Sequence, residues 1–387
     1  MSSIENSSQI RKNILFVTRP LSPPWDEASK NFAYNLACNI TNHNITILVD
    51  EYIDDAPKNI IQKKIYSNNH FSFLQKVRLL RYLKKHTEEF DVVHLLFTPT
   101  KLNSWLMKKI LHRRDAINRV SPQPQIVQTV ATLRDDLYSK EELQEMLFGD
   151  TVVTYSKWAN NKLNILDFTN AKQIYPGFNL SKYIPTEKST SLMKKWNISK
   201  DNFVVTYPGE FVRLGATDTI VEAFIKLWNN PSNAHIKYLC ACRIKNEKDA
   251  RKKQEVIEKI TAAGYIDKVY FTDTFSDMNA VYNLSDTVIF PVENMNGKFD
   301  VPLAMIEPYA CKKPVIASDL ELFKEFSSNE INVIIPGANS DALIDAILKL
   351  EKNPEKRKLL GENAFTFAHE TFNIERVATE YTEIYNR

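Results

Sequence analysis

The chain has 387 residues, of which 43% are hydrophobic and 25% charged, a composition typical of globular proteins with room for two domains. Its formal net charge of +3 is too small to indicate a nucleic-acid-binding protein. An apolar run of membrane-spanning length and a signal peptide are both absent from the sequence, so we expect a cytoplasmic protein. The four cysteines predict buried free thiols in a reducing compartment, with metal binding as the alternative.

Short β-branched apolar runs alternate with amphipathic segments along the first 180 residues. The runs predict strands over 13–19, 44–49, 60–66, 91–97, 125–131, 151–155 and 172–175. The segments between them predict helices over 26–42, 73–86, 102–114 and 156–166. Such alternation is typical of a parallel sheet covered by helices on both faces.

The pattern loosens after Gly177, and we interpret residues 181–200 as a linker. Further strands are expected over 203–207, 235–242, 268–271, 287–291 and 314–317. Further helices are expected over 217–228, 249–263, 340–352, 354–369 and 374–385. The sequence therefore predicts an α/β protein in which two doubly wound, Rossmann-like domains, residues 1–180 and 201–370, face a central cleft.

The stretch 284–319 combines a buried strand, a polar loop, an apolar helix and a second buried strand. Its loop carries Lys298 and Asp300. Pro302 follows and predicts the start of the helix, because proline is favoured in a helix's first turn. In a parallel unit of this kind the loop faces the ligand crevice, and the helix N-terminus favours an anion. Glu307 is the one carboxylate of the helix, so it either pairs internally or contacts a ligand.

Residues 307–318, EPYACKKPVIAS, resemble the characteristic helix and strand of family-4-like glycosyltransferases, which have the GT-B fold. Residues 91–94 (DVVH) and 174–180 (IYPGFNL) resemble other parts of that family. The resemblance implies a nucleotide-sugar donor whose ribose hydroxyls are bound by Glu307, and transfer with retention of configuration. It also implies that residues 371–387 form a helix that crosses back to the first domain.

Four positions depart from the pattern of this family, so the chain resembles an atypical branch of it. Glu210 stands where an arginine is expected, and Gly215 stands where a lysine is expected. Phe299 replaces a second acid, and Ala131 replaces a histidine. These departures favour an alternative function, a catalytically silent GT-B protein that binds a partner protein or a glycan.

Other cations follow the ends of the strands predicted for the second domain, where a diphosphate would bind. They are Arg213, Arg243, Lys245 and Lys298, and Asp300 lies near the last of them. Solvated loop cations are the alternative interpretation. The predicted catalytic residues are Arg213, Lys298 and Asp300. The predicted donor-binding residues are Glu307, Arg243, Lys245, Gly209, Val301 and Pro302.

In the first domain, polar residues follow two of the predicted strands and would face the cleft. Glu27, Lys30, Arg134 and Asp135 are the candidates for contact with the acceptor or the donor phosphates. The alternative for the loop after the first strand is that Asp26 and Ser29 only cap the helix that follows. The sequence has no Gly-x-Gly-x-x-Gly fingerprint and no Asp-x-Asp motif, so we expect neither a dinucleotide cofactor nor a metal ion.

Residues 71–86 and 101–114 are rich in lysine and arginine, and Phe73, Val77 and Leu80 form a stripe along the first segment. Basic amphipathic helices can lie on anionic membranes, and the resemblance implies acceptors that are often lipid-linked. Core-facing helices with solvated cations are the alternative.

We therefore predict a metal-independent glycosyltransferase of the hexosyltransferase type. It would transfer a sugar from a UDP- or GDP-type donor to a hydroxyl of a glycan, a lipid-linked saccharide or a small molecule. It would be cytoplasmic, with peripheral membrane contact if the basic segments meet a bilayer.

Overall fold

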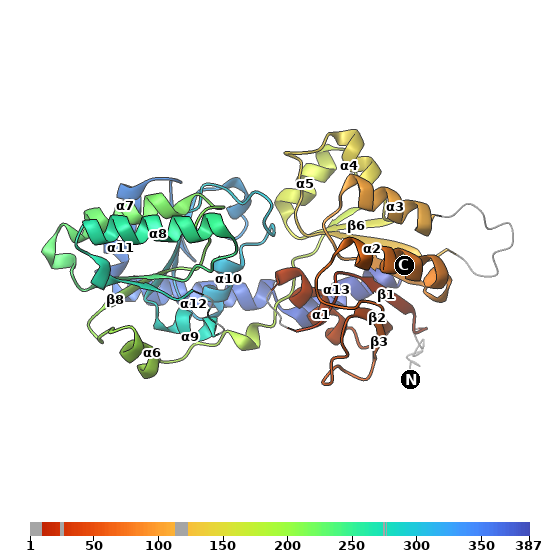
Figure 1. The fold of residues 1–387 in the computed structure, drawn as a ribbon, viewed down its shortest axis with the longest axis horizontal. Coiled ribbons are helices and arrows are strands. Elements are labelled where there is room, and N and C mark those ends of the chain that lie inside the picture. Colours follow the sequence, from red (N-terminus) through yellow and green to blue (C-terminus); the bar gives the residue numbers. More distant parts are fainter. Residues whose placement is uncertain (1–9, 24–26, 113–122, 274, 276) are drawn as a thin grey trace, which may run out of the picture. The chain divides into compact units, whose positions relative to one another are not determined.

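The computed structural model describes residues 10–23, 27–112, 123–273, 275 and 277–387, and it divides into two compact units (Figure 1). Unit 1 comprises residues up to 178 together with 299–301 and 374–387. Unit 2 comprises residues 179–298 and 302–373. The chain therefore passes from one unit to the other four times, and each unit is described separately below.

Unit 1 is built on a seven-stranded parallel sheet with the strand order β3-β2-β1-β4-β5-β6-β7. The strands are β1 (Asn13–Val17), β2 (Asn44–Val49), β3 (Ile60–Lys64), β4 (Val92–Leu95), β5 (Gln125–Val130), β6 (Thr151–Thr154) and β7 (Ala171–Gln173). The helices are α1 (Ala28–Asn39), α2 (Phe73–His86), α3 (Lys101–Leu111), α4 (Lys140–Met146), α5 (Lys157–Ile165) and α13 (Ile374–Tyr385). The connection β1–α1–β2 runs in one direction along the sheet and β4–α3–β5 runs in the other, so right-handed crossovers place α1 and α3 on opposite faces.

Apolar side chains from both faces of this sheet form the core of unit 1. Leu15, Val93 and Ile126 are buried on the face covered by α2 and α3, with Leu79 and Leu83 of α2 packed against them. On the other face α13 packs against α1, although more than 330 residues separate them in sequence. A parallel sheet needs such cover on both faces, which explains the nearly continuous apolar strands.

Unit 2 has a six-stranded parallel sheet with the order β10-β9-β8-β11-β12-β13. Its strands are β8 (Phe203–Tyr207), β9 (Ile236–Cys240), β10 (Val269–Phe271), β11 (Thr287–Phe290), β12 (Val315–Ser318) and β13 (Val333–Ile335). Its helices are α6 (Thr190–Lys195), α7 (Ala216–Trp228), α8 (Glu247–Ala262), α9 (Met278–Leu284), α10 (Leu303–Ala310), α11 (Ser340–Glu351) and α12 (Pro354–Thr371). Two parallel α/β units confirm the predicted fold class.

Several elements differ from the sequence-based expectations. Helices α4 and α9 and strand β13 were not predicted, and α6 lies within the range interpreted as a linker. Residue 26 of the first predicted helix and residues 113–114 of the third lie outside the described residues. Helix α2 faces the core of unit 1 through Gln75, Leu79 and Leu83, whereas Phe73 of the predicted stripe is 77% exposed.

Candidate functional site

Three neighbouring strands of unit 2 end at the same edge of its sheet and bring three candidate loops together. Strand β8 lies between β9 and β11, and all three run parallel. The loops 208–215, 241–246 and 291–302 leave the carboxyl ends of these strands. In open parallel sheets this edge is where ligands bind.

Glu210 is the centre of a charged cluster in these loops, which we call the Glu210 cluster and define as Glu210, Arg213, Lys245 and Lys298. The Glu210 side chain is 9% exposed, and its Oε1 accepts hydrogen bonds from the ammonium groups of both lysines. Burial raises the pKa of the Glu210 carboxyl, but the two lysines outweigh it and hold this pKa below its ordinary value. The residue that replaces the family's arginine is thus an ionised carboxylate shared by two cations.

Lys298 is half-buried, whereas Lys245 and the two arginines of these loops are exposed. Burial lowers the pKa of Lys298, the contact with Glu210 raises it, and the nearby charges of Lys245 and Arg213 lower it again. Arg213 is therefore close enough to Lys298 to act on its charge, although Arg213 itself is exposed. Arg243 is exposed in the loop after β9. The cluster presents cations to solvent around one buried acid.

Two glycines allow the loop after β8 to follow its path. A Cβ at Gly209 would lie 2.0 Å from Cζ of Tyr207, whose hydroxyl donates to the Glu210 carbonyl at 3.3 Å. Gly215 has φ +77°, and a Cβ there would lie 2.7 Å from a carboxylate oxygen of Glu293. The position where the family places a lysine is therefore one that favours glycine.

Glu307 lies in α10, whose N-cap is Pro302, and its carboxylate has partners within unit 2. The hydroxyl of Tyr282 donates to Oε2 at 2.8 Å, and Tyr183 is a second hydrogen-bond partner. Burial raises the pKa of the Glu307 carboxyl above its ordinary value, while the two tyrosines act in the opposite direction. Residue 307 as a whole is half-buried, so its internal pairing does not exclude a ligand contact.

Asp300 and Val301 belong to unit 1, not to the unit that carries the cations. The Asp300 amide donates to the carbonyl of Ala131 at 3.0 Å, and Oδ2 accepts from the Leu133 amide at 3.1 Å. The ring of Phe299 lies 4.8 Å from that of Tyr155. The segment 299–301 therefore joins the loop after β5, at the position where the family's histidine is replaced by alanine.

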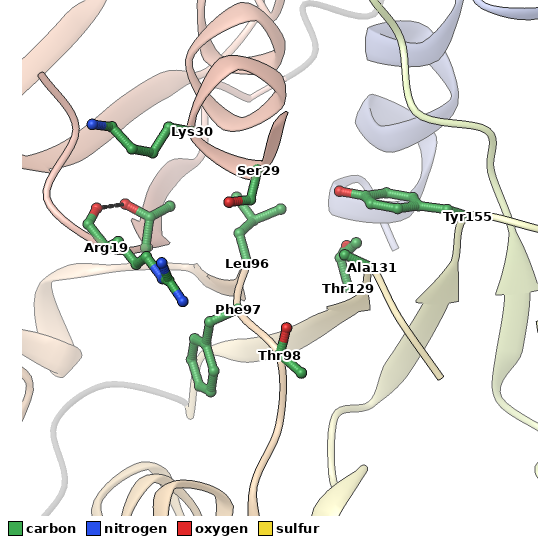
Figure 2. Close-up of a pocket in the computed structure, with 10 residues that line it drawn as sticks. Arg19, Ser29, Lys30, Leu96, Phe97, Thr98, Thr129, Ala131 and Tyr155 are labelled. Carbon is green, nitrogen blue, oxygen red and sulfur yellow. Dashed lines mark hydrogen bonds between the residues drawn. The ribbon is translucent and has the colours of Figure 1, made fainter. Parts of the chain in front are cut away.

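Unit 1 contains a cavity at the carboxyl ends of β1, β4, β5 and β6, and the first turn of α1 closes one side of it (Figure 2). The residues that line the cavity are Thr18, Arg19, Ser29, Lys30, Leu96, Phe97, Thr98, Thr129, Ala131 and Tyr155. In Figure 2, Lys30 and Arg19 lie on one side and Tyr155 lies opposite them. Lys30 is only 6% exposed.

The other candidates of unit 1 form ion pairs near the surface. Glu27, at the N-cap of α1, is paired with Arg19 at 3.0 Å. Arg134 is bound to both carboxylate oxygens of Asp136, at 2.8 and 2.9 Å. Asp135 lies 3.2 Å from Lys162 of α5. Among the four candidates of unit 1, Lys30 alone lines the cavity.

Sequence reasoning did not recognise a buried polar network beneath this cavity. His94 of β4 bonds through Nδ1 to the hydroxyl of Tyr385 and through Nε2 to Oγ1 of Thr129, both at 2.7 Å. Thr129 also lies 3.1 Å from the Tyr381 hydroxyl. Burial lowers the pKa of His94 to about 3, so its ring is neutral. A histidine within an otherwise apolar strand is the sequence signal from which this network could have been predicted.

The described part of the chain contains no group of three His, Cys, Asp or Glu side chains placed to bind a metal ion. Cys240, Cys242 and Cys311 are buried free thiols, and Cys38 is half-buried. The prediction of free thiols is confirmed for these residues.

Comparison with known proteins identifies the family. Residues 188–367, most of unit 2, match the family model described as Glycosyl transferases group 1. A relative from Methanocaldococcus jannaschii, the uncharacterized glycosyltransferase MJ1069, is 24% identical over 312 residues, or 77% of this chain and 76% of the relative. Residues 188–367 therefore belong to the glycosyl transferase group 1 family.

Solved structures of low sequence identity have the same fold. Alr3699/HepE of Anabaena, in complex with UDP, has a TM-score of 0.72 at 15% identity, covering 97% of this chain and 99% of that one. A glycosyltransferase of Rickettsia africae has a TM-score of 0.75 at 18% identity. The sucrose-phosphate synthase of Thermosynechococcus elongatus has a TM-score of 0.73 at 16% identity. Both cover 97% of this chain and 98% of their own. These likenesses confirm the GT-B prediction.

Proposed function

We propose that this group 1 glycosyltransferase transfers a sugar from a nucleotide-sugar donor of the UDP type to a hydroxyl acceptor, with retention of configuration. The observation that carries the proposal is the Glu210 cluster, which gathers three cations at the ligand-binding edge of the sheet in unit 2. UDP is preferred to GDP because Alr3699/HepE, which shares the fold, was solved with UDP and with UDP-glucose.

In this proposal each loop of unit 2 binds one part of the donor. Glu307 accepts hydrogen bonds from the ribose hydroxyls, with its carboxylate oriented by Tyr282. Lys298, Arg213 and the other cations bind the diphosphate and stabilise the negative charge that grows on it as the glycosidic bond breaks. Positioning and leaving-group stabilisation then supply most of the catalysis. Asp300, which belongs to unit 1, is the proposed carboxylate for sugar hydroxyls and is held by the Leu133 amide.

Thermal unfolding with a set of nucleotides tests the donor site. A ligand at about 100 times its Kd stabilises the native state by about 2.7 kcal/mol, so a specific nucleotide raises the midpoint clearly. Uridine, UDP and UDP-glucose are compared with their guanosine counterparts on the wild-type protein. We expect UDP and UDP-glucose to raise the midpoint more than uridine, which lacks the diphosphate.

Two variants separate the two halves of the donor site. Glu307→Gln should weaken the binding of uridine and of UDP alike, by about tenfold or more, because a charge-assisted hydrogen bond to the ribose is lost. Lys298→Met should weaken the binding of UDP and leave the binding of uridine unchanged. Glu258→Gln, an exposed acid on α8, is the control. If no nucleotide raises the midpoint, the alternative of a silent protein that binds a partner or a glycan is favoured instead.

A surface on α2 and α3 supports the further proposal that the acceptor is presented at an anionic membrane. This α2–α3 surface consists of the exposed apolar residues Phe73, Leu74, Leu102 and Trp105 and the exposed cations Arg78, Arg81, Lys84, Lys85, Lys101, Lys108 and Lys109. The two helices pack against each other, so these exposed side chains come from neighbouring elements of unit 1 (Figure 1). Apolar and basic residues together are what binds a protein to an anionic bilayer surface. Among the described residues, no helix has the length and apolar character needed to cross a bilayer.

Sedimentation with vesicles tests the α2–α3 surface. We expect binding to vesicles that contain phosphatidylserine and much weaker binding to pure phosphatidylcholine, with the difference reduced by added salt. The double variant Phe73→Ser with Trp105→Ser should lose binding, because it removes the aromatic groups that would enter the interface. Ile165→Ser, an equally exposed apolar residue on α5, is the control. Equal binding by all three proteins would contradict the assignment.

A further inference from the structure

A second hollow of unit 1 lies along β3 and shares no residue with the cavity of Figure 2. It has a volume of about 390 Å³, within the roughly 300–1,000 Å³ that small-molecule sites occupy. We call it the β3 groove. It is lined by residues 62–65, by Tyr52 from the loop after β2, and by Tyr82, His86 and Glu89 at the end of α2 and just beyond it.

The free edge of β3 gives the groove backbone donors and acceptors. Among the described residues, β3 is the last strand of its sheet and pairs only with β2. The Ile65 amide donates to the Val49 carbonyl of β2 at 3.2 Å. Because the backbone groups of successive residues point to opposite sides of a strand, those of Gln62 and Lys64 point away from β2. Their N–H and C=O groups therefore face the open side of the sheet.

Aromatic rings supply the apolar part of the groove. Tyr52 is 63% exposed, although an aromatic side chain usually buries most of its surface. The ring of Tyr82 stacks on that of His86, with centroids 4.6 Å apart and an angle of 28° between the planes. Nδ1 of His86 lies 2.6 Å from Oε1 of Glu89, which fixes the orientation of the imidazole. The C–H face of a sugar ring packs well on such aromatic faces, because their electron density is negative.

The polar groups of the groove include both donors and acceptors. Lys63 and Lys64 are exposed and donate, whereas the Glu89 carboxylate and the outward carbonyls of β3 accept. A phosphate would use the donors only, but hydroxyl groups both donate and accept, so a polyhydroxylated ligand can use all of them. An extended peptide is disfavoured, because lysines on an edge strand oppose the addition of another strand.

We propose that the β3 groove binds a short segment of a neutral saccharide, packed on Tyr52 and bonded through its hydroxyls to Lys64 and to the backbone of Gln62. The Glu210 cluster belongs to the other unit, so this is a second ligand site that does not require the proposed donor site. A glycan held in this groove would stay on the protein whether or not a nucleotide is bound.

Saturation-transfer NMR with the full chain tests the ligand class. The probes are cellobiose, maltose and N,N′-diacetylchitobiose, each at concentrations up to about 10 mM, where weak binding is detected. AMP, which has an aromatic base and a phosphate, is the probe for the competing class of ligand. We expect at least one disaccharide to bind with a Kd of about 1 mM, and AMP to bind more weakly.

Four variants locate the binding. Tyr52→Ala should weaken disaccharide binding about tenfold, because the exposed ring is lost, and Lys64→Met should also weaken it. Tyr52→Phe keeps the ring and should retain most of the binding. Leu137→Ala, which removes a side chain of similar exposure (57%) from another loop, is the control. Tyr52 is exposed, so its variants are expected to fold.

Each outcome decides the assignment. Absence of binding by all three disaccharides would overturn the proposal, and so would binding that Tyr52→Ala leaves unchanged, since the saccharide would then lie elsewhere. Tighter binding of AMP than of every disaccharide, lost in Tyr52→Ala, would assign the groove to nucleotides instead. Stabilisation by UDP is measured on the same proteins and should be equal in all of them. Disaccharide binding that depends on Tyr52, in a protein that UDP does not stabilise, would support the β3 groove while the proposed donor site fails.

Discussion

The substitution His94→Gln, which removes a buried titratable group, is the sharpest test of the packing under the unit 1 cavity. His94 is completely buried in β4 and bonds to Thr129, which lines the cavity, and to Tyr385 of α13. Burial lowers the pKa of His94 from 6.5 to about 3. The folded protein therefore keeps this ring neutral at a pH where the unfolded chain would protonate it.

The sign and size of the effect follow from linkage. Because the folded-state pKa of His94 is depressed, its contribution to stability is complete above about pH 6.5 and is lost as the pH falls toward 3. Each pH unit in this window costs about 1.4 kcal/mol. Between pH 7 and pH 5 the unfolding free energy of unit 1 should fall by about 2 kcal/mol through this one group.

Amide hydrogen exchange of β4 and β5 measures the effect locally, which suits a protein of two units. Opening free energies are determined at pH 7 and pH 5, with correction for the intrinsic exchange rate. The wild-type protein should lose about 2 kcal/mol more than His94→Gln over this interval, roughly thirtyfold in the opening equilibrium. His86→Gln, a histidine paired with Glu89 at the surface, is the control and should behave as wild type.

If wild type and His94→Gln lose the same free energy between these pH values, His94 does not resist protonation and the reasoning fails. A larger loss confined to amides outside β4, β5 and α13 would also contradict it, because the bonds of His94 connect these three elements.

Glu210→Gln should destabilise unit 2 by about 2 to 4 kcal/mol at neutral pH, because two lysines lose their shared carboxylate. The pKa of the Glu210 carboxyl is lowered in the folded protein, so its stabilising effect is present above the ordinary pKa of 4.5 and is lost as the pH falls below that value. The unfolding midpoints of wild type and Glu210→Gln should therefore converge in acid. Gly361→Ala should destabilise unit 2 by about 1 to 3 kcal/mol, since a Cβ there would lie 2.2 Å from the Lys312 carbonyl oxygen. Gly337→Ala, with no atom nearer than 3.8 Å, should leave the unfolding midpoint unchanged.

The central strands were predicted from sequence because parallel strands buried on both faces are nearly continuous apolar runs. Strands β8 and β11 were found in this way, and every residue in them is buried. Helix α4 (KEELQEM) buries only two side chains in a single short stretch, so it has no apolar period to detect. Strand β13 has three residues at the edge of its sheet, where the burial pattern is weak.

The candidate site was predictable as a set of loops but not as a set of contacts. Cations after strand ends could be located from the sequence, since those ends share one edge of a parallel sheet. The role of Glu210 could not, because its partners lie 35 and 88 residues away and depend on β8 lying between β9 and β11. For the same reason, nothing in the sequence indicated that Asp300 belongs to unit 1.

The charge of the Glu210 cluster bears on whether the departures from the family pattern abolish donor binding. The family pattern implies one arginine and one lysine, which together carry two positive charges. In this chain Lys245, Lys298 and Arg213 surround one ionised carboxylate, which leaves the same net charge on the cluster. A lysine at position 215 would have needed a left-handed backbone and space occupied by Glu293. The lysines from two neighbouring loops thus supply charge that position 215 cannot, and Glu210 holds both lysines in place. The substitutions are consistent with a rebuilt diphosphate site, which is why we propose an active transferase.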